Sequence, residues 1–98
     1  MENKPLISVI TVTLNSEATI AKAIESVLDQ TYGNVEYIIM DGGSKDSTVA
    51  IAESYRQRFA AKGYKFTIVS EHDKGMYHAL NKGVELATGD IIGQINSD

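Results

Sequence analysis

Polar and acidic residues follow each of four apolar runs in this sequence. The four places are Thr13-Leu14-Asn15, Asp41-Gly42-Gly43, Glu71–Lys74 and Asn96-Ser97-Asp98. Side chains of these types supply oxygen atoms that accept hydrogen bonds from a ligand or bind a hard cation. When such runs are parallel strands of one open α/β sheet, their carboxyl ends share one edge, where ligands bind. The pattern therefore predicts a binding site built from the ends of several strands.

Asp41 carries the sharpest signal, because it ends an apolar run and precedes two glycines. A carboxylate at this position can accept hydrogen bonds from a nucleobase N–H or a ribose hydroxyl. Gly42 and Gly43 allow the backbone to approach a ligand without an intervening side chain. A turn or helix-capping aspartate is the alternative, and position alone supports it equally well.

Asp98, the last residue, follows the fourth apolar run, and its carboxylate can ligate a hard divalent cation. One carboxylate is not a metal site, and position alone favours an ordinary chain terminus. Thr13 and Asn15 can contact a base or ribose, although Asn15 also suits the capping of the helix that follows. Asp73 and Lys74 precede another helix, where Lys74 can pair with a phosphate or simply belong to a solvated loop.

Two periodicities alternate along the chain and predict the elements that position these residues. Apolar and β-branched runs predict strands at residues 6–14, 35–40, 65–70 and 90–96. Helical spacing predicts a helix after the capping residues Asn15-Ser16-Glu17, a second that begins near Ser44–Ser47 and ends at Gly63, and a third at 76–87. The order β-α-β-α-β-α-β predicts an open, mostly parallel sheet of about four strands with helices on both faces.

The composition is that of one small globular domain and disfavours several classes of protein. The chain has 98 residues, no cysteine and a formal net charge of −4. The charge argues against a nucleic-acid partner, and the lack of cysteine argues against disulfides or a thiolate zinc site. No segment has the length of a membrane span or the layout of a signal peptide, so a cytoplasmic location is expected. The first strand–helix turn, 13–19, contains no glycine, which disfavours a dinucleotide-binding dehydrogenase.

Five segments of the chain resemble the start of family 2 glycosyltransferases, in the order in which that family has them. They are ISVITVTLN at 7–15, SVLDQTY at 26–32, IMDGGSKDST at 39–48, DKGMYHALNKG at 73–83 and ATGDIIGQINSD at 87–98. Each segment is a weak signal alone, whereas the ordered set is specific. It strengthens the functional interpretation of Asp41 and Asp98.

The resemblance implies a GT-A fold, which is Rossmann-like, and transfer of a sugar from a nucleoside diphosphate donor, most commonly a UDP-sugar, to an acceptor hydroxyl. Asp41 matches the aspartate that contacts the nucleobase, and Thr13 lies in the segment that lines the nucleotide pocket. Asn96-Ser97-Asp98 matches the opening of the DxD-type element, so the resemblance implies Mg²⁺ or Mn²⁺ at Asp98 and a nucleotide contact at Ser97. Asp73 and Lys74 match a segment near the nucleotide. The acceptor is expected to be a glycan or a lipid-linked sugar, in polysaccharide or glycan biosynthesis.

The sequence departs from the family pattern at several positions. Leu14 stands where a tyrosine is frequent, and Gly42 and Asn96 stand where aspartates are frequent. The chain also stops at Asp98, so residues 1–98 are expected to be the nucleotide-sugar-binding part of a domain cut at its metal-binding motif. We expect this part to bind a nucleoside diphosphate weakly, to transfer no sugar, and to form a homo-oligomer through the truncated face. Peripheral membrane association is a further expectation for a longer protein.

Two other classes share part of this pattern. A non-catalytic nucleotide-binding α/β module would have the acidic strand ends but would not need the metal element. An α/β interaction domain would bind no nucleotide at all.

Overall fold

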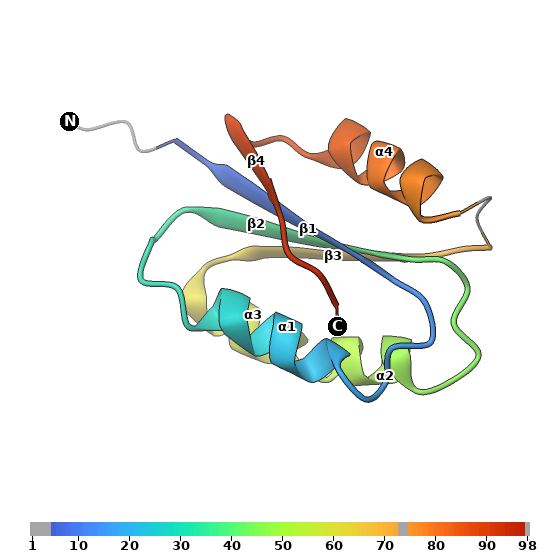
Figure 1. The fold of residues 1–98 in the computed structure, drawn as a ribbon. Helices are drawn as coiled ribbons and strands as arrows, with labels where there is room; N and C mark the ends of the chain where they lie inside the picture. The colour runs from blue at the N-terminus through green and yellow to red at the C-terminus, as the bar shows by residue number, and fades with distance from the viewer. Residues whose placement is uncertain (1–4, 73–74, 98) are drawn as a thin grey trace.

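The computed structural model describes residues 5–72 and 75–97, and Figure 1 shows their fold. Strands and helices alternate along the chain. In order they are β1 (Ile7–Thr13), α1 (Ile20–Leu28), β2 (Val35–Asp41), α2 (Thr48–Glu53), α3 (Arg56–Lys62), β3 (Lys65–Ser70), α4 (Met76–Leu86) and β4 (Ile91–Gln94). The alternation that the sequence predicts is therefore confirmed.

The strands form one parallel sheet in the order β3-β2-β1-β4. The chain adds β2 and β3 outward from β1, and α4 then carries it back to place β4 on the other side of β1. The strand order thus reverses between β1 and β4. Ligands of open α/β sheets bind beyond the carboxyl ends of the strands at such a reversal, so the topology directs attention to the ends of β1 and β4.

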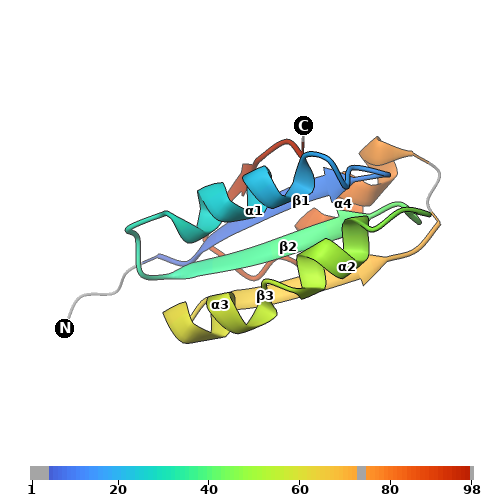
Figure 2. The same ribbon diagram turned by 90° about the horizontal axis from the view of Figure 1, so that it is seen from below.

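The helices cover both faces of the sheet. Figure 1 shows α4 on one face and α1, α2 and α3 on the other, and Figure 2 shows these three in front of the strands. Side chains alternate between the faces along each strand, so Tyr37 and Ile39 pack toward α1 and α3 while Ile38 and Met40 pack toward α4. Among the described residues, none of the helices has the length and apolar character needed to cross a membrane.

The predicted second helix is divided into α2 and α3 by a turn at Ser54 and Tyr55. The Ser54 hydroxyl donates to the carbonyl of Ile51 at 2.6 Å, and this local bond competes with regular helix geometry. Phe59 of α3 then packs against Phe66 of β3 with ring centroids 4.3 Å apart. The expectation of one continuous helix was wrong, but its predicted end is confirmed, because Gly63 terminates α3 with a left-handed φ of 75°.

Gly83 allows α4 to lie close to the sheet. A Cβ atom at this position would lie 2.9 Å from Cγ2 of Ile10 and 3.0 Å from Cγ of Met40. Ala79, one turn earlier, is 1% exposed and belongs to the same core. The two small residues therefore lie on the face of α4 that packs against the sheet.

A buried carboxylate fixes the amino end of the sheet, opposite to the strand ends discussed above. Oε1 of Glu36 accepts hydrogen bonds from the Ser8 hydroxyl at 2.8 Å, the Thr88 N–H at 2.9 Å and the Thr88 hydroxyl at 3.1 Å. The Gly89 N–H donates to Oγ of Ser8 at 2.9 Å. This network ties the connection between α4 and β4 to β1 and β2, and so fixes where β4 begins.

The same contacts set the ionisation of Glu36. Burial acts to raise the pKa of its carboxyl, but the hydrogen bonds from Thr88 and Ser8, aided by the positive charge of Lys65, outweigh burial and leave the pKa below the ordinary value of 4.5. A carboxyl whose pKa is lower in the folded state contributes stability above its unfolded pKa. That contribution is lost as the pH falls through the folded value.

We therefore expect Glu36→Gln to lower the free energy of unfolding by about 1–2 kcal/mol at pH 7, because hydrogen bonds to a charged acceptor become bonds to a neutral one. The difference from wild type should begin to shrink below about pH 4.5 and should disappear as the pH falls through the lower folded pKa, where the wild-type carboxyl becomes protonated too. Urea denaturation at several pH values measures both effects. Glu85→Gln, at an exposed position on α4, is the matched control. A pH-independent difference for Glu36→Gln would contradict this account.

Candidate functional site

Three neighbouring strands end side by side at the carboxyl edge of the sheet. Thr13 of β1 pairs in register with Asp41 of β2, which pairs in register with Ser70 of β3. Thr13 and Asp41 are buried, with exposed fractions of 0% and 1%. The polar strand ends predicted from the sequence are therefore neighbours, and this edge is the candidate site.

The Asp41 carboxylate is surrounded by donors from the protein itself. Its Oδ2 accepts hydrogen bonds from the N–H groups of Gly43 at 3.0 Å and Ser44 at 2.8 Å, and from the Ser70 hydroxyl at 2.8 Å. Its Oδ1 accepts from the Ser44 hydroxyl at 2.5 Å. Asp41 thus connects the end of β3 to the loop between β2 and α2, which we call the β2–α2 loop (residues 42–47).

The loop between β1 and α1 (residues 14–19, the β1–α1 loop) is joined to the β2–α2 loop through Asn15. The Asn15 N–H donates to Oγ of Ser44 at 2.7 Å, and its side-chain Oδ1 accepts from the Lys45 N–H at 2.8 Å. Asn15 holds this position with a φ of 49°, a conformation that asparagine tolerates better than most residues. Its side chain is committed to the neighbouring loop rather than to the helix α1.

Three further hydrogen bonds join the β1–α1 loop to residues 46–48. The Ser16 N–H donates to Oγ1 of Thr48 at 2.8 Å. The Glu17 N–H donates to Oδ2 of Asp46 at 3.2 Å, and Oε1 of Glu17 accepts from the Ser47 N–H at 3.0 Å. Hydrogen bonds from the Thr48 hydroxyl, and from the N–H groups of Thr48 and Glu17, lower the pKa of Asp46.

The expectation that Asn15, Ser16 and Glu17 cap α1 was therefore wrong. The residue before α1 is Thr19, which makes no side-chain capping hydrogen bond, and the first turn is closed by the Ser16 carbonyl instead. The polar side chains of Asn15 and Glu17 bind backbone N–H groups of the β2–α2 loop because that loop lies beside them. Sequence spacing could not reveal this partner, which is 29 or 30 positions away.

Buried polar groups set the course of the segment after β4. The Thr11 hydroxyl donates to the Ile95 carbonyl at 2.9 Å, and the Tyr37 hydroxyl lies 2.7 Å from Oγ1 of Thr11. Burial raises the pKa of Tyr37 to about 12, although its contact with Thr11 opposes the increase, so it is a neutral donor at physiological pH. The Ile95 N–H also donates to the Ile10 carbonyl at 3.1 Å. These bonds direct residues 96–97 toward the ends of β1 and β2.

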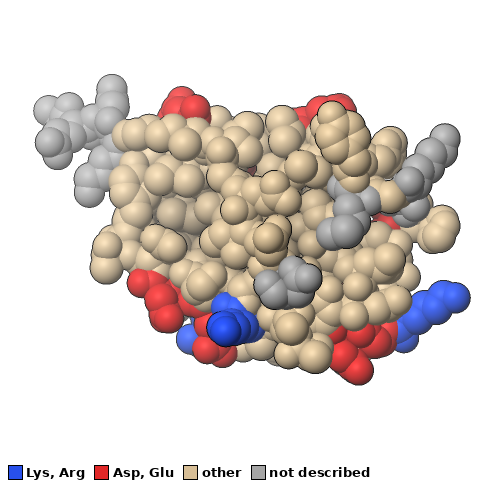
Figure 3. All heavy atoms as spheres, viewed as in Figure 1, with Lys and Arg blue, Asp and Glu red and all other residues tan. Residues whose placement is uncertain are grey.

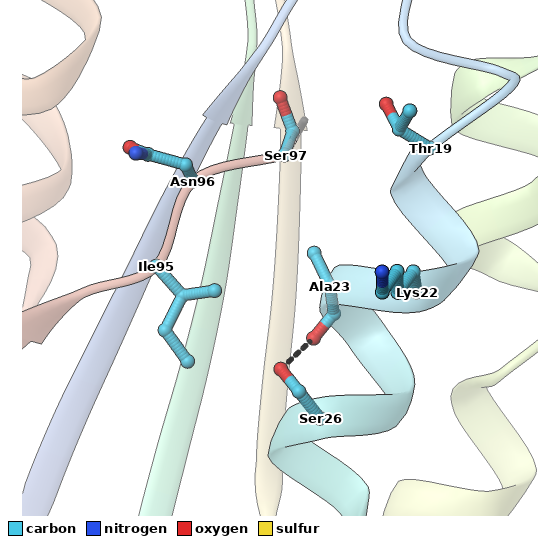
Figure 4. A pocket seen from close by; sticks show the side chains of 7 residues that line it. All are labelled: Thr19, Lys22, Ala23, Ser26, Ile95, Asn96 and Ser97. Atoms are coloured by element: carbon cyan, nitrogen blue, oxygen red, sulfur yellow. Dashed lines mark hydrogen bonds between the residues drawn. The ribbon is translucent and has the colours of Figure 1, made fainter.

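Ser97 lies at the same edge as Thr13 and Asp41. It is 6% exposed, and its Oγ lies 3.4 Å from Oγ of Ser16 in the β1–α1 loop. A half-open hollow of about 300 Å³ separates residues 95–97 from α1, where Thr19, Lys22, Ala23 and Ser26 form its other wall (Figure 4). The structure thus brings Thr13, Asn15, Asp41 and Ser97 together.

The predicted residues Asp73, Lys74 and Asp98 lie outside the described residues. Among residues 5–72 and 75–97, no group of three His, Cys, Asp or Glu side chains is arranged to hold a metal ion. The sequence does not predict the roles of Ser44 and Ser70. Its pattern indicates only that a helix begins near Ser44 and that a strand ends at Ser70, and their common partner, Asp41, becomes visible only when β2 and β3 are paired.

Oγ1 of Thr13 has an unusual status in this site. Of the buried side-chain oxygen and nitrogen atoms in the described residues, this one alone has no hydrogen-bond partner. Leaving such a hydroxyl unpaired costs free energy, and most buried polar groups avoid it. The hydroxyl lies at the end of β1, next to the strand-order reversal, where a ligand would be expected to bind.

The sequence matches the family "Glycosyl transferase family 2" over residues 8–98. The chain belongs to this family. Among curated proteins, a PGL/p-HBAD biosynthesis glycosyltransferase of Mycobacterium bovis is 39% identical over 85 residues, which cover 87% of this chain and 32% of that protein. The chain thus spans about a third of the length of that relative.

Solved structures of glycosyltransferases have the same fold. The mannosyltransferase PcManGT from Pyrobaculum calidifontis, in complex with GDP-Man and Mn²⁺, is 26% identical with a TM-score of 0.87, over 98% of this chain and 28% of its own. TarS residues 1–349 of S. aureus, in complex with UDP-GlcNAc, is 27% identical with a TM-score of 0.81, over 95% of this chain and 26% of its own. The predicted family and fold class are both confirmed.

Two threonines of β1 provide a matched test of the unpaired hydroxyl. Both Thr11 and Thr13 are 0% exposed, but of their two hydroxyl groups only that of Thr11 has hydrogen-bond partners among the described residues. We expect Thr11→Val to lower the free energy of unfolding by about 1–3 kcal/mol, since Tyr37 and Ile95 lose their partner. Thr13→Val should leave it unchanged or raise it by up to about 2 kcal/mol. Equal destabilisation in urea denaturation would mean that the Thr13 hydroxyl is paired.

Proposed function

We propose that this chain is the nucleotide-sugar-binding part of a GT-A glycosyltransferase, which transfers a sugar from a nucleoside diphosphate donor to an acceptor hydroxyl. The observation that carries the proposal is the convergence of Thr13, Asp41 and Ser97 on one edge, at the strand-order reversal, in a chain of family 2. The edge offers oxygen acceptors and hydroxyl groups, which suit a nucleoside better than an apolar ligand.

The donor is held, in this proposal, by the loops that follow β1 and β2. Thr13 and Asn15 lie on the side of the base and ribose, Asp41 belongs to the same pocket, and Ser97 faces the diphosphate. Asp73 and Lys74 are further proposed contacts. The similar proteins named above bind a GDP-sugar in one complex and a UDP-sugar in another. The fold they share therefore does not determine the base, and a UDP-sugar is our first candidate.

A divalent cation, Mg²⁺ or Mn²⁺, fits the chemistry of the segment after β4. Asn96 and Ser97 carry oxygen donors, and Asp98 adds a carboxylate, which together match the preference of hard cations for oxygen. The described residues alone hold no three-ligand cluster, which agrees with a cation held partly by Asp98 and partly by phosphate oxygens. When bound, the cation offsets negative charge on the departing diphosphate. The complex of PcManGT with GDP-Man and Mn²⁺ supports this choice.

Sugar transfer needs groups that we do not find among residues 5–72 and 75–97. A general base must take the proton of the acceptor hydroxyl, and the Asp41 carboxylate already accepts hydrogen bonds from four groups of the protein. We therefore propose that residues 1–98 bind the nucleotide weakly and transfer no sugar by themselves. Three predictions concern a longer protein. We expect its acceptor to be a glycan or a lipid-linked sugar, its location to be cytoplasmic and its association with membranes to be peripheral.

Titration of ¹⁵N-labelled protein with UDP, with and without Mn²⁺, tests the proposed function. We expect amide shifts in residues 13–17 and 42–45, and a lower Kd when Mn²⁺ is present. Asp41→Asn should raise the Kd by about tenfold, because the hydrogen bonds that the charged carboxylate accepts from the β2–α2 loop and Ser70 are weakened. Asp29→Asn, at an exposed position after α1, should leave the Kd unchanged.

Other outcomes of this titration favour the other classes. Shifts that do not depend on Mn²⁺ would favour a nucleotide-binding module without the metal element, and no shifts at all would favour an interaction domain. Measurable sugar transfer by this chain alone would contradict the proposal that it lacks the catalytic base.

We also propose that this chain self-associates through β4. Ile91 and Ile92 are 51% and 46% exposed, and β4 is at the edge of the sheet. The surface around β4 is largely free of charged side chains in the view of Figure 3. An exposed apolar edge strand favours pairing with another chain.

Sedimentation velocity tests this proposal. It should detect dimers of the wild type, and Ile92→Lys should abolish them. A wild type that stays monomeric at millimolar concentration would contradict the proposal.

A further inference from the structure

We propose that Asp41 is a positioning residue: it holds the β2–α2 loop in the shape that receives the nucleotide and does not itself contact the base. This inference rests on the proposed function, because it concerns how the same site recognises its ligand. It differs from the role that the family resemblance implies for Asp41. The reason lies in what the carboxylate already binds.

Most of the hydrogen-bonding capacity of Asp41 is used by the protein. A carboxylate offers about four acceptor positions on its two oxygens. Four donors bind it at 2.5–3.0 Å: the N–H groups of Gly43 and Ser44 and the Ser70 hydroxyl share Oδ2, and the Ser44 hydroxyl binds Oδ1. The residue is also 1% exposed, so the remaining position on Oδ1 is closed to solvent. A base could reach this carboxylate only if the residues that bury it moved, and a donor lost in that movement would remain unpaired at a cost in free energy.

The donors around Asp41 belong to three strand ends. The Asn15 N–H donates to Oγ of Ser44, whose hydroxyl donates to Asp41, and Ser70 donates to Asp41 from the other side. The chain of contacts therefore runs from the β1–α1 loop through β2 to β3. Hydrogen bonds linked in this way strengthen one another and fix one arrangement of the groups they join.

Close contacts also constrain the backbone of the loop that Asp41 holds. Gly43 adopts a φ of 91°, and a Cβ atom there would lie 3.3 Å from Cα of His72. The Gly42 N–H donates to the Thr13 carbonyl at 2.9 Å. The loop is thus confined between the end of β1 and the residues that follow β3.

This arrangement predicts how substitution affects different bases. The N3 atom of uracil carries a hydrogen, whereas N3 of cytosine is an acceptor. If Asp41 contacted that edge of the base, Asp41→Asn would weaken UDP strongly and favour CDP, because the new amide can donate to cytosine. If Asp41 only positions the loop, the substitution raises the Kd of both nucleotides by the same factor, which we expect to be about tenfold.

The experiment measures the Kd of UDP and CDP with Mn²⁺ for the wild type, Asp41→Asn and Ser70→Ala, with Ser54→Ala as control. Ser70→Ala removes one donor to Asp41 without altering Asp41, and we expect it to raise both Kd values by a common, smaller factor. Ser54 bonds only within its own turn, and its substitution should change neither value. A change in the UDP/CDP ratio of threefold or more in Asp41→Asn would overturn the proposal.

A second readout needs no ligand. In the nucleotide-free protein, Asp41→Asn and Ser70→Ala should shift the amide resonances of Gly43, Ser44 and Lys45, while Ser54→Ala should not. Unchanged loop resonances in both site variants would overturn the positioning role. If the wild type binds neither UDP nor CDP, the proposed function fails, and these loop resonances still decide whether Asp41 holds the loop.

Discussion

The hydrogen bonds that the Asp41 carboxylate accepts are the interaction on which the carboxyl edge of the sheet depends. They join the end of β3 to the loop after β2, and through Ser44 they reach the loop after β1. Parallel strands bring these loops near each other, but nothing in a strand ladder fixes the shape of a loop beyond it. A buried carboxylate with several donors does so, since each donor it loses would remain unpaired at a cost in free energy.

The remainder of the fold delivers the segment after β4 to this edge. Glu36 fixes the point where β4 begins, through Thr88 and Ser8, and the Tyr37–Thr11 pair holds the carbonyl of Ile95 where β4 has ended. Between these two anchors β4 pairs with β1 over Ile91–Gln94 alone. Asn96 and Ser97 are therefore positioned by buried polar groups at both ends of a short strand, more than by the strand itself.

Much of this architecture could be predicted from the sequence, because strand and helix periodicity and the polar strand ends are local patterns. Asp41 at the end of β2 and Gly63 at the end of α3 both followed from their immediate neighbours. The pairing of Asn15 and Glu17 with the β2–α2 loop did not, since a cap and a cross-loop hydrogen bond use the same side chains. The break at Ser54 also depended on packing between α3 and β3. The sequence could suggest that Asp41 binds something, but only the paired strands reveal that the protein itself supplies its donors.

Paramagnetic broadening by Mn²⁺ is the most direct test of the central claim that one edge of the sheet receives a nucleotide and its cation. The measurement compares amide signals of the protein with Mn²⁺ and UDP against the same protein with Mg²⁺ and UDP. We predict that broadening is strongest at Ile95–Ser97, extends to the loops after β1 and β2, and is absent near Glu36 and Lys65 at the opposite end of the strands. Broadening centred at that opposite end, or spread evenly over the exposed acidic residues, would contradict the account.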